Sequence, residues 1–153
     1  MKTKFFLMAA VLLMFASCGS DDESSATIYY KAVCSGITFE NSADDVYREK
    51  IEAALTGMQF IGEASYFATS ASAGNVAEAS AQCDAQAVTL YQGRLDGLTL
   101  MILKQKVYLM YAEEFQTAGI MSFNDLPFKN LTIHVKLLNS QSAMLVKEFD
   151  KAF

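Results

Sequence analysis

Residues 1–17 decide where a folded domain can begin in this chain. Lys2 and Lys4 precede an uninterrupted apolar run from Phe5 to Ala16. As a helix this run would rise about 18 Å, whereas the hydrocarbon core of a bilayer is about 30 Å thick. The run is too short for a good membrane span and has the length of the apolar region of a signal peptide. We therefore expect residues 1–17 to be a cleaved signal that contributes nothing to the fold.

Small residues and a cysteine follow the apolar run, in the order Ala16, Ser17 and Cys18. A signal peptidase requires small side chains beside the cleaved bond, but this does not account for the cysteine. The stretch resembles the lipobox of bacterial lipoproteins, whose cysteine is lipidated and becomes the new N-terminus. The resemblance implies lipid attachment at Cys18 and a membrane anchor without a transmembrane helix. An ordinary secretory signal followed by an unrelated cysteine is the alternative.

An acidic stretch, Ser20–Glu23, follows directly after Gly19. It resembles the acidic export tag of surface lipoproteins in Bacteroides-type bacteria. That resemblance implies an outer-membrane protein that is lipid-anchored and faces the cell surface, while a solvated acidic linker is the alternative. Because small polar residues continue the stretch, residues 18–26 are predicted to form the lipidated cysteine and a flexible tether. Both resemblances concern only the N-terminal part of the chain.

The remaining residues, 27–153, have the length of a single domain. The whole chain carries 12 Lys and Arg against 17 Asp and Glu, and loss of Lys2 and Lys4 makes its net charge of −5 more negative. Nucleic acids require a basic surface, so we do not expect them as partners. Hydrophobic residues make up 52% of the chain, which is enough for a core. No cofactor is indicated.

Two further cysteines, Cys34 and Cys83, remain once Cys18 is assigned to lipid. An even pair in an oxidising compartment can form a disulfide. The bond would close a loop of about fifty residues and stabilise the fold by roughly 4 kcal/mol in the chain-entropy model. The alternative is two buried free thiols, because cysteine is among the most buried residue types.

The first elements of the domain are expected to be a strand and a helix. Residues 27–35 are rich in β-forming residues and predict a strand with Cys34 on its core-facing side. After Ser42, the expected N-cap, apolar residues recur at helical spacing as far as Gly57, which suits the C-terminal cap. This segment therefore predicts an amphipathic helix.

A second strand and helix are expected to follow. The aromatic residues of 59–69 favour a strand, although the segment alternates poorly. Asn75 is expected to cap a helix that runs to about Tyr91 and ends at Gly93. Cys83 lies on the apolar stripe of this helix and would face the sheet, which makes a bond with the first strand conceivable.

The C-terminal half is expected to be mostly β-structure. Residues 98–111 are strongly apolar and fit a long strand, a hairpin or a helix, and their β-formers favour a strand. Residues 112–130 are expected to be a long connection. Strict alternation in 131–137 predicts a strand. Residues 143–149 are expected to return as its hairpin partner, with a short helix from Ser142 as the alternative.

These elements predict an α+β fold. The expected order is roughly β-α-β-α-β-β-β, and it predicts a two-layer sandwich in which two helices pack on one antiparallel or mixed sheet.

Side chains that could carry catalysis or hold a metal are scarce. His134 is the single histidine, and no nucleophile motif accompanies it, so a surface histidine is expected. The acidic pairs Asp44–Asp45 and Glu113–Glu114 lack the glycine-interleaved spacing of a calcium loop. We therefore predict neither catalytic residues nor metal ligands.

Four tyrosines on predicted strands offer a binding surface instead. Exposed aromatic rings can stack on sugars or contact another protein, whereas plain core packing is the alternative. Together with the predicted anchor, they favour a non-catalytic module that binds a glycan, a peptide or an envelope partner. The alternatives are an envelope-assembly lipoprotein that pairs through a sheet edge such as 131–137, and a carboxylate-dependent hydrolase. The four residues are Tyr29, Tyr66, Tyr108 and Tyr111.

Overall fold

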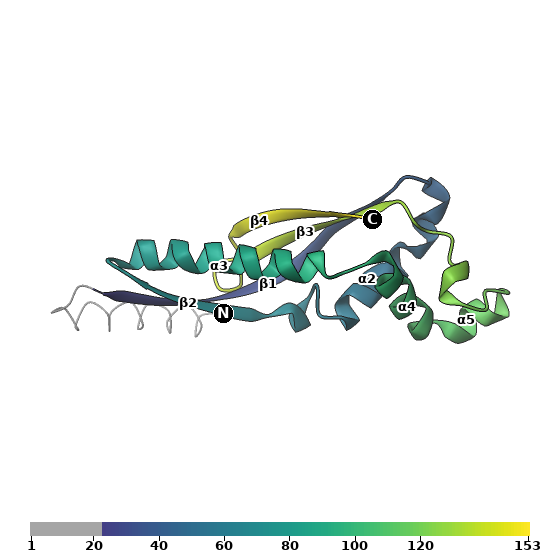
Figure 1. Cartoon of the computed structure of the whole chain (residues 1–153), viewed down its shortest axis with the longest axis horizontal. Helices are drawn as coiled ribbons and strands as arrows, with labels where there is room; N and C mark the ends of the chain where they lie inside the picture. The colour runs from purple at the N-terminus through teal and green to yellow at the C-terminus, as the bar shows by residue number, and fades with distance from the viewer. Residues whose placement is uncertain (1–22) are drawn as a thin grey trace.

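One long strand, β1 (Ser24–Phe39), runs through the structure, a computed structural model that describes residues 23–153 (Figure 1). The strand order is β2-β1-β3-β4, and every neighbouring pair is antiparallel. The α+β prediction is thereby confirmed. The other strands are β2 (Phe67–Ala73), β3 (Leu131–Asn139) and β4 (Leu145–Ala152).

The two halves of β1 have different neighbours. Its first half pairs with β2 as far as Tyr30, and its second half pairs with β3 from Tyr30 onward. Beyond Tyr30 the side of β1 that faced β2 is completed by a loop: Gly62 N donates to Ala32 O at 2.8 Å, and Ala32 N donates to Ser65 Oγ at 3.0 Å. The sheet is therefore staggered and elongated.

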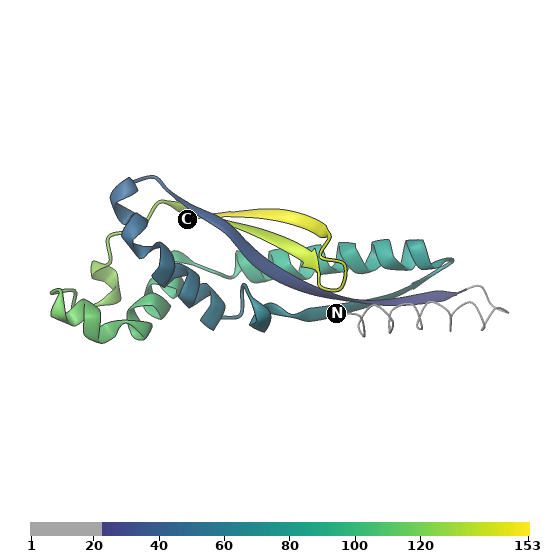
Figure 2. The ribbon, with the colours of Figure 1, turned by 180° about the vertical axis from the view of Figure 1, so that it is seen from behind.

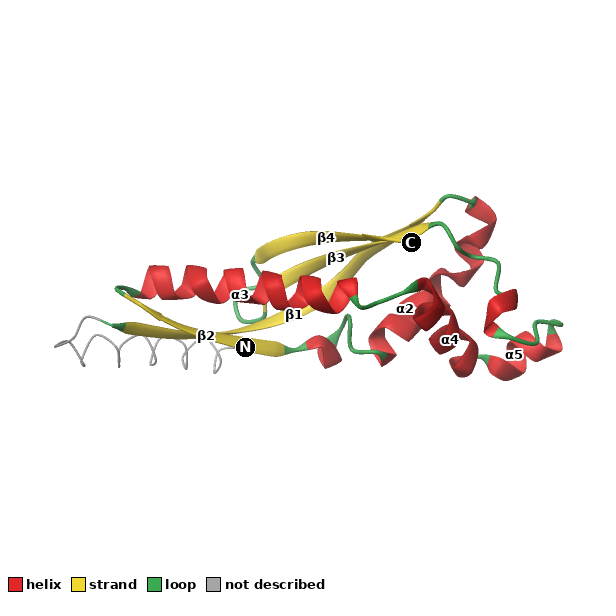
Figure 3. Ribbon diagram, in the orientation of Figure 1, coloured by secondary structure: helices red, strands yellow, loops and turns green. Residues whose placement is uncertain are grey.

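Helix α3 (Val76–Asp96) lies along one face of the sheet (Figure 3). Its N-terminus is capped as predicted, because Asn75 Oδ1 accepts a hydrogen bond from Glu78 N at 2.9 Å. The helix continues past Gly93, since its buried stripe continues to Leu95. The buried side chains are Ala79, Cys83, Ala87, Tyr91 and Leu95.

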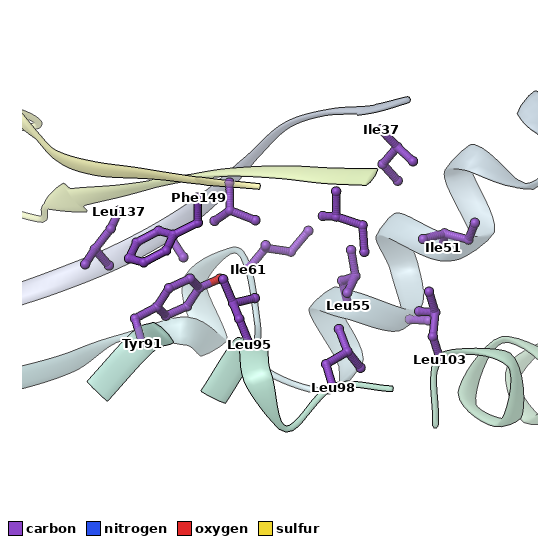
Figure 4. Close-up of a cluster of buried hydrophobic side chains, with 14 of the residues drawn as sticks. Ile37, Ile51, Leu55, Ile61, Tyr91, Leu95, Leu98, Leu103, Leu137 and Phe149 are labelled. Carbon is purple, nitrogen blue, oxygen red and sulfur yellow. The ribbon is translucent and has the colours of Figure 1, made fainter. Parts of the chain in front are cut away.

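The remaining helices gather beyond one end of the sheet (Figure 2). Their side chains extend the core, with Leu55 and Leu103 continuing from Ile37 and Ile61 (Figure 4). The α-helices are α2 (Arg48–Gly57), α4 (Leu100–Met110) and α5 (Ala112–Thr117), and the 3₁₀ turns are η1 (Ser42–Tyr47), η2 (Glu63–Ser65) and η3 (Phe123–Asp125).

The prediction of a strand over 98–111 is wrong, because this segment forms α4. Thr99 Oγ1 caps the helix by accepting a hydrogen bond from Ile102 N at 3.2 Å. Leu103 and Val107, four residues apart, are the side chains of α4 that are fully buried. A segment with apolar residues on nearly every side gives no clear periodicity to separate helix from strand. Residues 112–130, expected as a connection, contain α5 and η3.

Two element boundaries also differ from the prediction. Strand β2 begins at Phe67, since Gln59 and Gly62 adopt positive φ angles of 65° and 80° that interrupt extended backbone. The cap of the first helical segment is Asn41, whose Oδ1 accepts from Ala43 N at 3.1 Å, and Ser42 is the first helical residue. The predicted β3–β4 hairpin is confirmed, and the alternative helix from Ser142 does not form.

Candidate functional site

The two faces of the sheet have different environments. Helix α3 covers one face. Seen from the opposite side, β1 and β3 lie in front of α3, so this view looks onto the second face of the sheet (Figure 2). Side chains on this second face alternate with the core residues of β1 and include Tyr29, which is 46% exposed, and Lys31. We call it the open face.

A pocket of about 490 Å³ lies on the open face, where the β3–β4 turn approaches β1. Its volume lies within the range of about 300–1,000 Å³ that is typical of small-molecule sites. Apolar side chains, two charged groups and several amides and hydroxyls share its lining. The residues are Lys31, Val33, Glu63, Tyr66, Leu138, Asn139, Ser140, Gln141, Ser142 and Ala143.

The β3–β4 turn that forms one wall is held by its own hydrogen bonds. Asn139 Oδ1 accepts from the backbone N–H groups of Gln141 at 3.0 Å and Ser142 at 3.2 Å. Ala143 N donates to Asn139 O at 2.8 Å, with Ala143 at a φ of 59°. Ser140 N donates to Tyr29 O at 2.8 Å and ties the turn to β1. The wall is therefore fixed in position relative to the strand beside it.

The side-chain amide of Gln141 is the least satisfied group in the pocket. Its Oε1 is buried and has no hydrogen-bond partner within residues 23–153. Exchanging the amide oxygen and nitrogen would leave a buried donor in the same place, so the group needs a partner in either orientation. Leaving such a group unpaired costs about 1–3 kcal/mol. Rotation of the Gln141 side chain toward the pocket would let a ligand supply the missing hydrogen bond and recover much of that cost.

A charged pair and an aromatic ring line the opposite side of the pocket. Lys31 Nζ lies 3.3 Å from Glu63 Oε1 and 5.9 Å from the centre of the Tyr66 ring. Glu63 is largely exposed, so solvent screens this pair and its contribution to stability is small. The opposite charges balance, and this side of the pocket offers both a donor and an acceptor beside an aromatic surface.

The four tyrosines predicted as a binding surface separate into two pairs. Tyr29 and Tyr66 lie on the open face, and Tyr66 lines the pocket. Tyr108 and Tyr111 lie on and just after α4, where their rings pack 5.8 Å and 6.4 Å from that of Phe115. This second pair belongs to the helical core and does not join the first.

His134 belongs to a hydrogen-bonded row across three strands of the open face. Its Nε2 lies 2.8 Å from Thr38 Oγ1 on β1, and its Nδ1 lies 2.7 Å from Asp150 Oδ1 on β4. A hydroxyl, an imidazole and a carboxylate in this order also occur in hydrolase triads. Here Thr38 and Asp150 are exposed and His134 only half-buried, an environment typical of cross-strand pairs on a solvated sheet.

The acidic pairs do not converge on a common site. Asp44 is only 6% exposed and lines a cavity of about 520 Å³ at the end of β1, whereas Asp45 forms an ion pair with Arg48. Glu114 lies 2.9 Å from Lys50 Nζ. Over residues 23–153, no three His, Cys, Asp or Glu side chains come together as a metal site.

Cys34, which is half-buried, and Cys83, which is buried, are free thiols, so the possible disulfide between them does not form. Cys83 Sγ donates to Ala26 O at 3.4 Å, and Ala26 lies about 26 Å along β1 from Cys34 at roughly 3.3 Å per residue. A disulfide requires Cα atoms within about 7 Å. Burial raises the pKa of the Cys34 thiol, which lowers its reactivity. Cys18 lies outside the described residues.

Sequence reasoning missed the pocket residues contributed by the β3–β4 turn. The run Asn139–Ser142 is recognisable as a turn between two strands, but its contact with β1 depends on the stagger of the sheet. None of the family models, curated proteins or solved structures compared with the chain matches it. No helix within residues 23–153 combines the length and the apolar character that a membrane crossing requires.

Proposed function

We propose that this domain is a non-catalytic binding module, and that its open-face pocket holds a hydroxyl-rich ligand such as a unit of a glycan. The observation that carries the proposal is a pocket of about 490 Å³ whose lining includes Gln141, a residue whose buried amide oxygen has no hydrogen-bond partner within residues 23–153. A sugar hydroxyl can both donate and accept a hydrogen bond, so it satisfies this amide in either orientation.

The rest of the lining supports the same class of ligand. Tyr66 offers an aromatic surface on which a sugar ring can stack, and Lys31 and Glu63 offer a donor and an acceptor. The charge balance between these two side chains favours a neutral ligand over an anion or a cation.

A glycan array tests this proposal with the detergent-extracted protein. Gln141→Leu removes the amide while keeping a side chain of similar size, and Gln105→Leu makes the same change at an exposed position of α4 as the control. We expect the wild type and Gln105→Leu to bind the same glycans. Gln141→Leu should bind them about 10- to 100-fold more weakly, which corresponds to about 1–3 kcal/mol. Equal binding by all three proteins, or selective binding of peptides, would overturn the assignment.

We further propose that the module is lipid-anchored at the outer membrane and faces the cell surface. The proposal rests on the sequence resemblances at Cys18 and Ser20–Glu23. More than one acyl chain is needed for stable anchoring, and lipoprotein N-termini carry several. In a Bacteroides-type host, the intact mass of the membrane-extracted protein should show loss of residues 1–17 and the addition of acyl chains. A soluble species without lipid would contradict the anchor.

A second candidate role, assembly through a sheet edge at 131–137, fails at that location. This segment lies in β3, which pairs with β1 on one side and β4 on the other, so it is an interior strand. The two edges of the sheet are β2 and β4.

A further inference from the structure

The two edge strands of the sheet differ sharply in charge. Edge strands are commonly protected from pairing with other chains by charged residues, proline or bulges. Strand β4 (Leu145–Ala152) contains Lys147, Glu148, Asp150 and Lys151. Strand β2 reads Phe-Ala-Thr-Ser-Ala-Ser-Ala, with neither charge nor proline. The β2 edge is therefore chemically suited to pair with another strand.

The hydrogen-bond pattern identifies the residues of β2 whose backbone points outward. Tyr29 O accepts from Ser140 N, so the backbone groups of Tyr29 point toward β3 and away from β2. In an antiparallel ladder both backbone groups of a residue point to the same side, and the side alternates along the strand. Ala68 pairs with Tyr29, so its backbone N–H and C=O point away from β1. By the same alternation, the backbone N–H and C=O groups of Ser70 and Ser72 also point away from β1.

These outward groups form a row without partners. No hydrogen bond joins the outward backbone groups of Ala68, Ser70 or Ser72 to any other residue between 23 and 153. The ladder of β2 with β1 is continuous over the same stretch, from Phe67 to Ala73. The edge therefore presents a regular extended template and not a frayed end.

We propose that β2 pairs with β2 of a second copy of this chain, antiparallel and with the two-fold axis at Ser70. In this register Ser70 lies opposite its own copy, and Ala68 lies opposite Ser72 of the partner subunit. All three outward residues are then paired, which gives about six backbone hydrogen bonds. A shift of the axis by one residue leaves one of them unpaired, so the centred register is favoured.

The side chains of β2 suit this self-pairing. Phe67, the one large residue of the strand, lies opposite Ala73 of the partner subunit on the helix-covered face. The edge carries no charge, so two copies of an acidic protein meet here without like charges facing one another directly. A two-fold axis perpendicular to the sheet places both open faces, and both pockets, on the same side of an eight-stranded sheet. A membrane-anchored pair would then present two sites in one direction.

Cysteine cross-linking of the full chain in membranes tests the register. Directly opposite residues of a hydrogen-bonded pair have Cα atoms about 5.5 Å apart, within reach of a disulfide. Under mild oxidation Ser70→Cys should form a covalent dimer. Ser72→Cys is the matched control, because it is also an exposed serine of the open face but is offset from its own copy by about 13 Å along the strand, at roughly 3.3 Å per residue. The control and the wild type should remain monomeric on a non-reducing gel.

A second variant keeps the test informative if the disulfide is disfavoured. Ser70→Lys places a charge at the centre of the edge and should convert a dimer into a monomer, as measured by the mass of the detergent-extracted protein, with an unchanged circular dichroism spectrum. A monomeric wild type would overturn the proposal, and so would equal cross-linking of Ser70→Cys and Ser72→Cys. Because the pocket residues are untouched, glycan binding by the Ser70→Lys monomer would separate this failure from failure of the proposed function.

Discussion

Two buried tyrosines show how single polar atoms are satisfied inside this core. Tyr30 OH donates to Asp84 Oδ1 at 2.7 Å, and Tyr91 OH donates to Phe60 O at 2.6 Å. Both rings are fully buried, between α3 and the sheet. Burial raises the pKa of both hydroxyls above the usual value near 10, because an ionised phenolate would lose its hydration. Each hydroxyl therefore remains protonated while the protein is folded.

This arrangement predicts a loss of stability in alkali. Above about pH 10 the tyrosines of the unfolded chain ionise while Tyr30 and Tyr91 of the folded chain do not. The unfolded state then binds fewer protons, so the free energy of unfolding falls as the pH rises. Urea titrations at pH 8 and pH 11 should show this fall, and Tyr91→Phe should reduce it while costing about 1 kcal/mol at pH 8. If Tyr91→Phe leaves the fall unchanged, the role of Tyr91 is refuted.

The residues of the pocket could be predicted only in part. Alternation along a strand identifies Tyr29 as facing away from the core residues Ile28 and Tyr30. The role of Gln141 depends on the turn meeting β1 and on the loop that carries Glu63, which no local pattern encodes. Choosing between a disulfide and two free thiols for Cys34 and Cys83 likewise required knowing where each residue lies along the sheet.

Helix α4 is the element that the sequence pattern left ambiguous. Its side chains are apolar on nearly every side, and Thr99 at its N-terminus is a good strand former in sequence terms. In the structure Thr99 Oγ1 accepts from Ile102 N, and the segment is helical. By contrast, β3 was predicted correctly because its buried and partly exposed residues alternate strictly from Leu131 to Leu137. The periodicity of apolar residues identifies a helix or strand when one face of the element is polar. It does not do so when apolar residues lie on nearly every side.

The cap of α4 gives a prediction at the scale of the element. Thr99→Ala should lower the free energy of unfolding by about 1 kcal/mol, because the Ile102 N–H loses its acceptor. Thr99→Ser retains the hydroxyl and should restore most of the loss, as measured by urea unfolding followed by circular dichroism. Equal stability of the alanine and serine variants would show that the hydroxyl does not cap the helix.

The whole molecule offers two surfaces of different character. The open face carries the polar pocket at the β3–β4 turn. Helices α2, α4 and α5, with the segments that join them, lie beyond the other end of the sheet, and we call them the helical lobe (Figure 2). This lobe exposes large apolar side chains instead, including Met101, Leu109 and Met121. Between these two surfaces, the pocket is the one that offers hydrogen-bond partners to a hydroxyl-rich ligand, so the helical lobe serves as an apolar comparison.

Hydrogen exchange of the detergent-extracted protein, with and without its tightest glycan from the array, tests the central proposal most directly. Binding in the pocket should slow exchange in peptides that cover 138–144 and 62–67, because the ligand restricts opening of the turn and of the loop beside it. Peptides of α4 and α5 should exchange at an unchanged rate. Protection confined to residues 100–121, with none at the β3–β4 turn, would contradict the assignment and place ligand binding on the helical lobe.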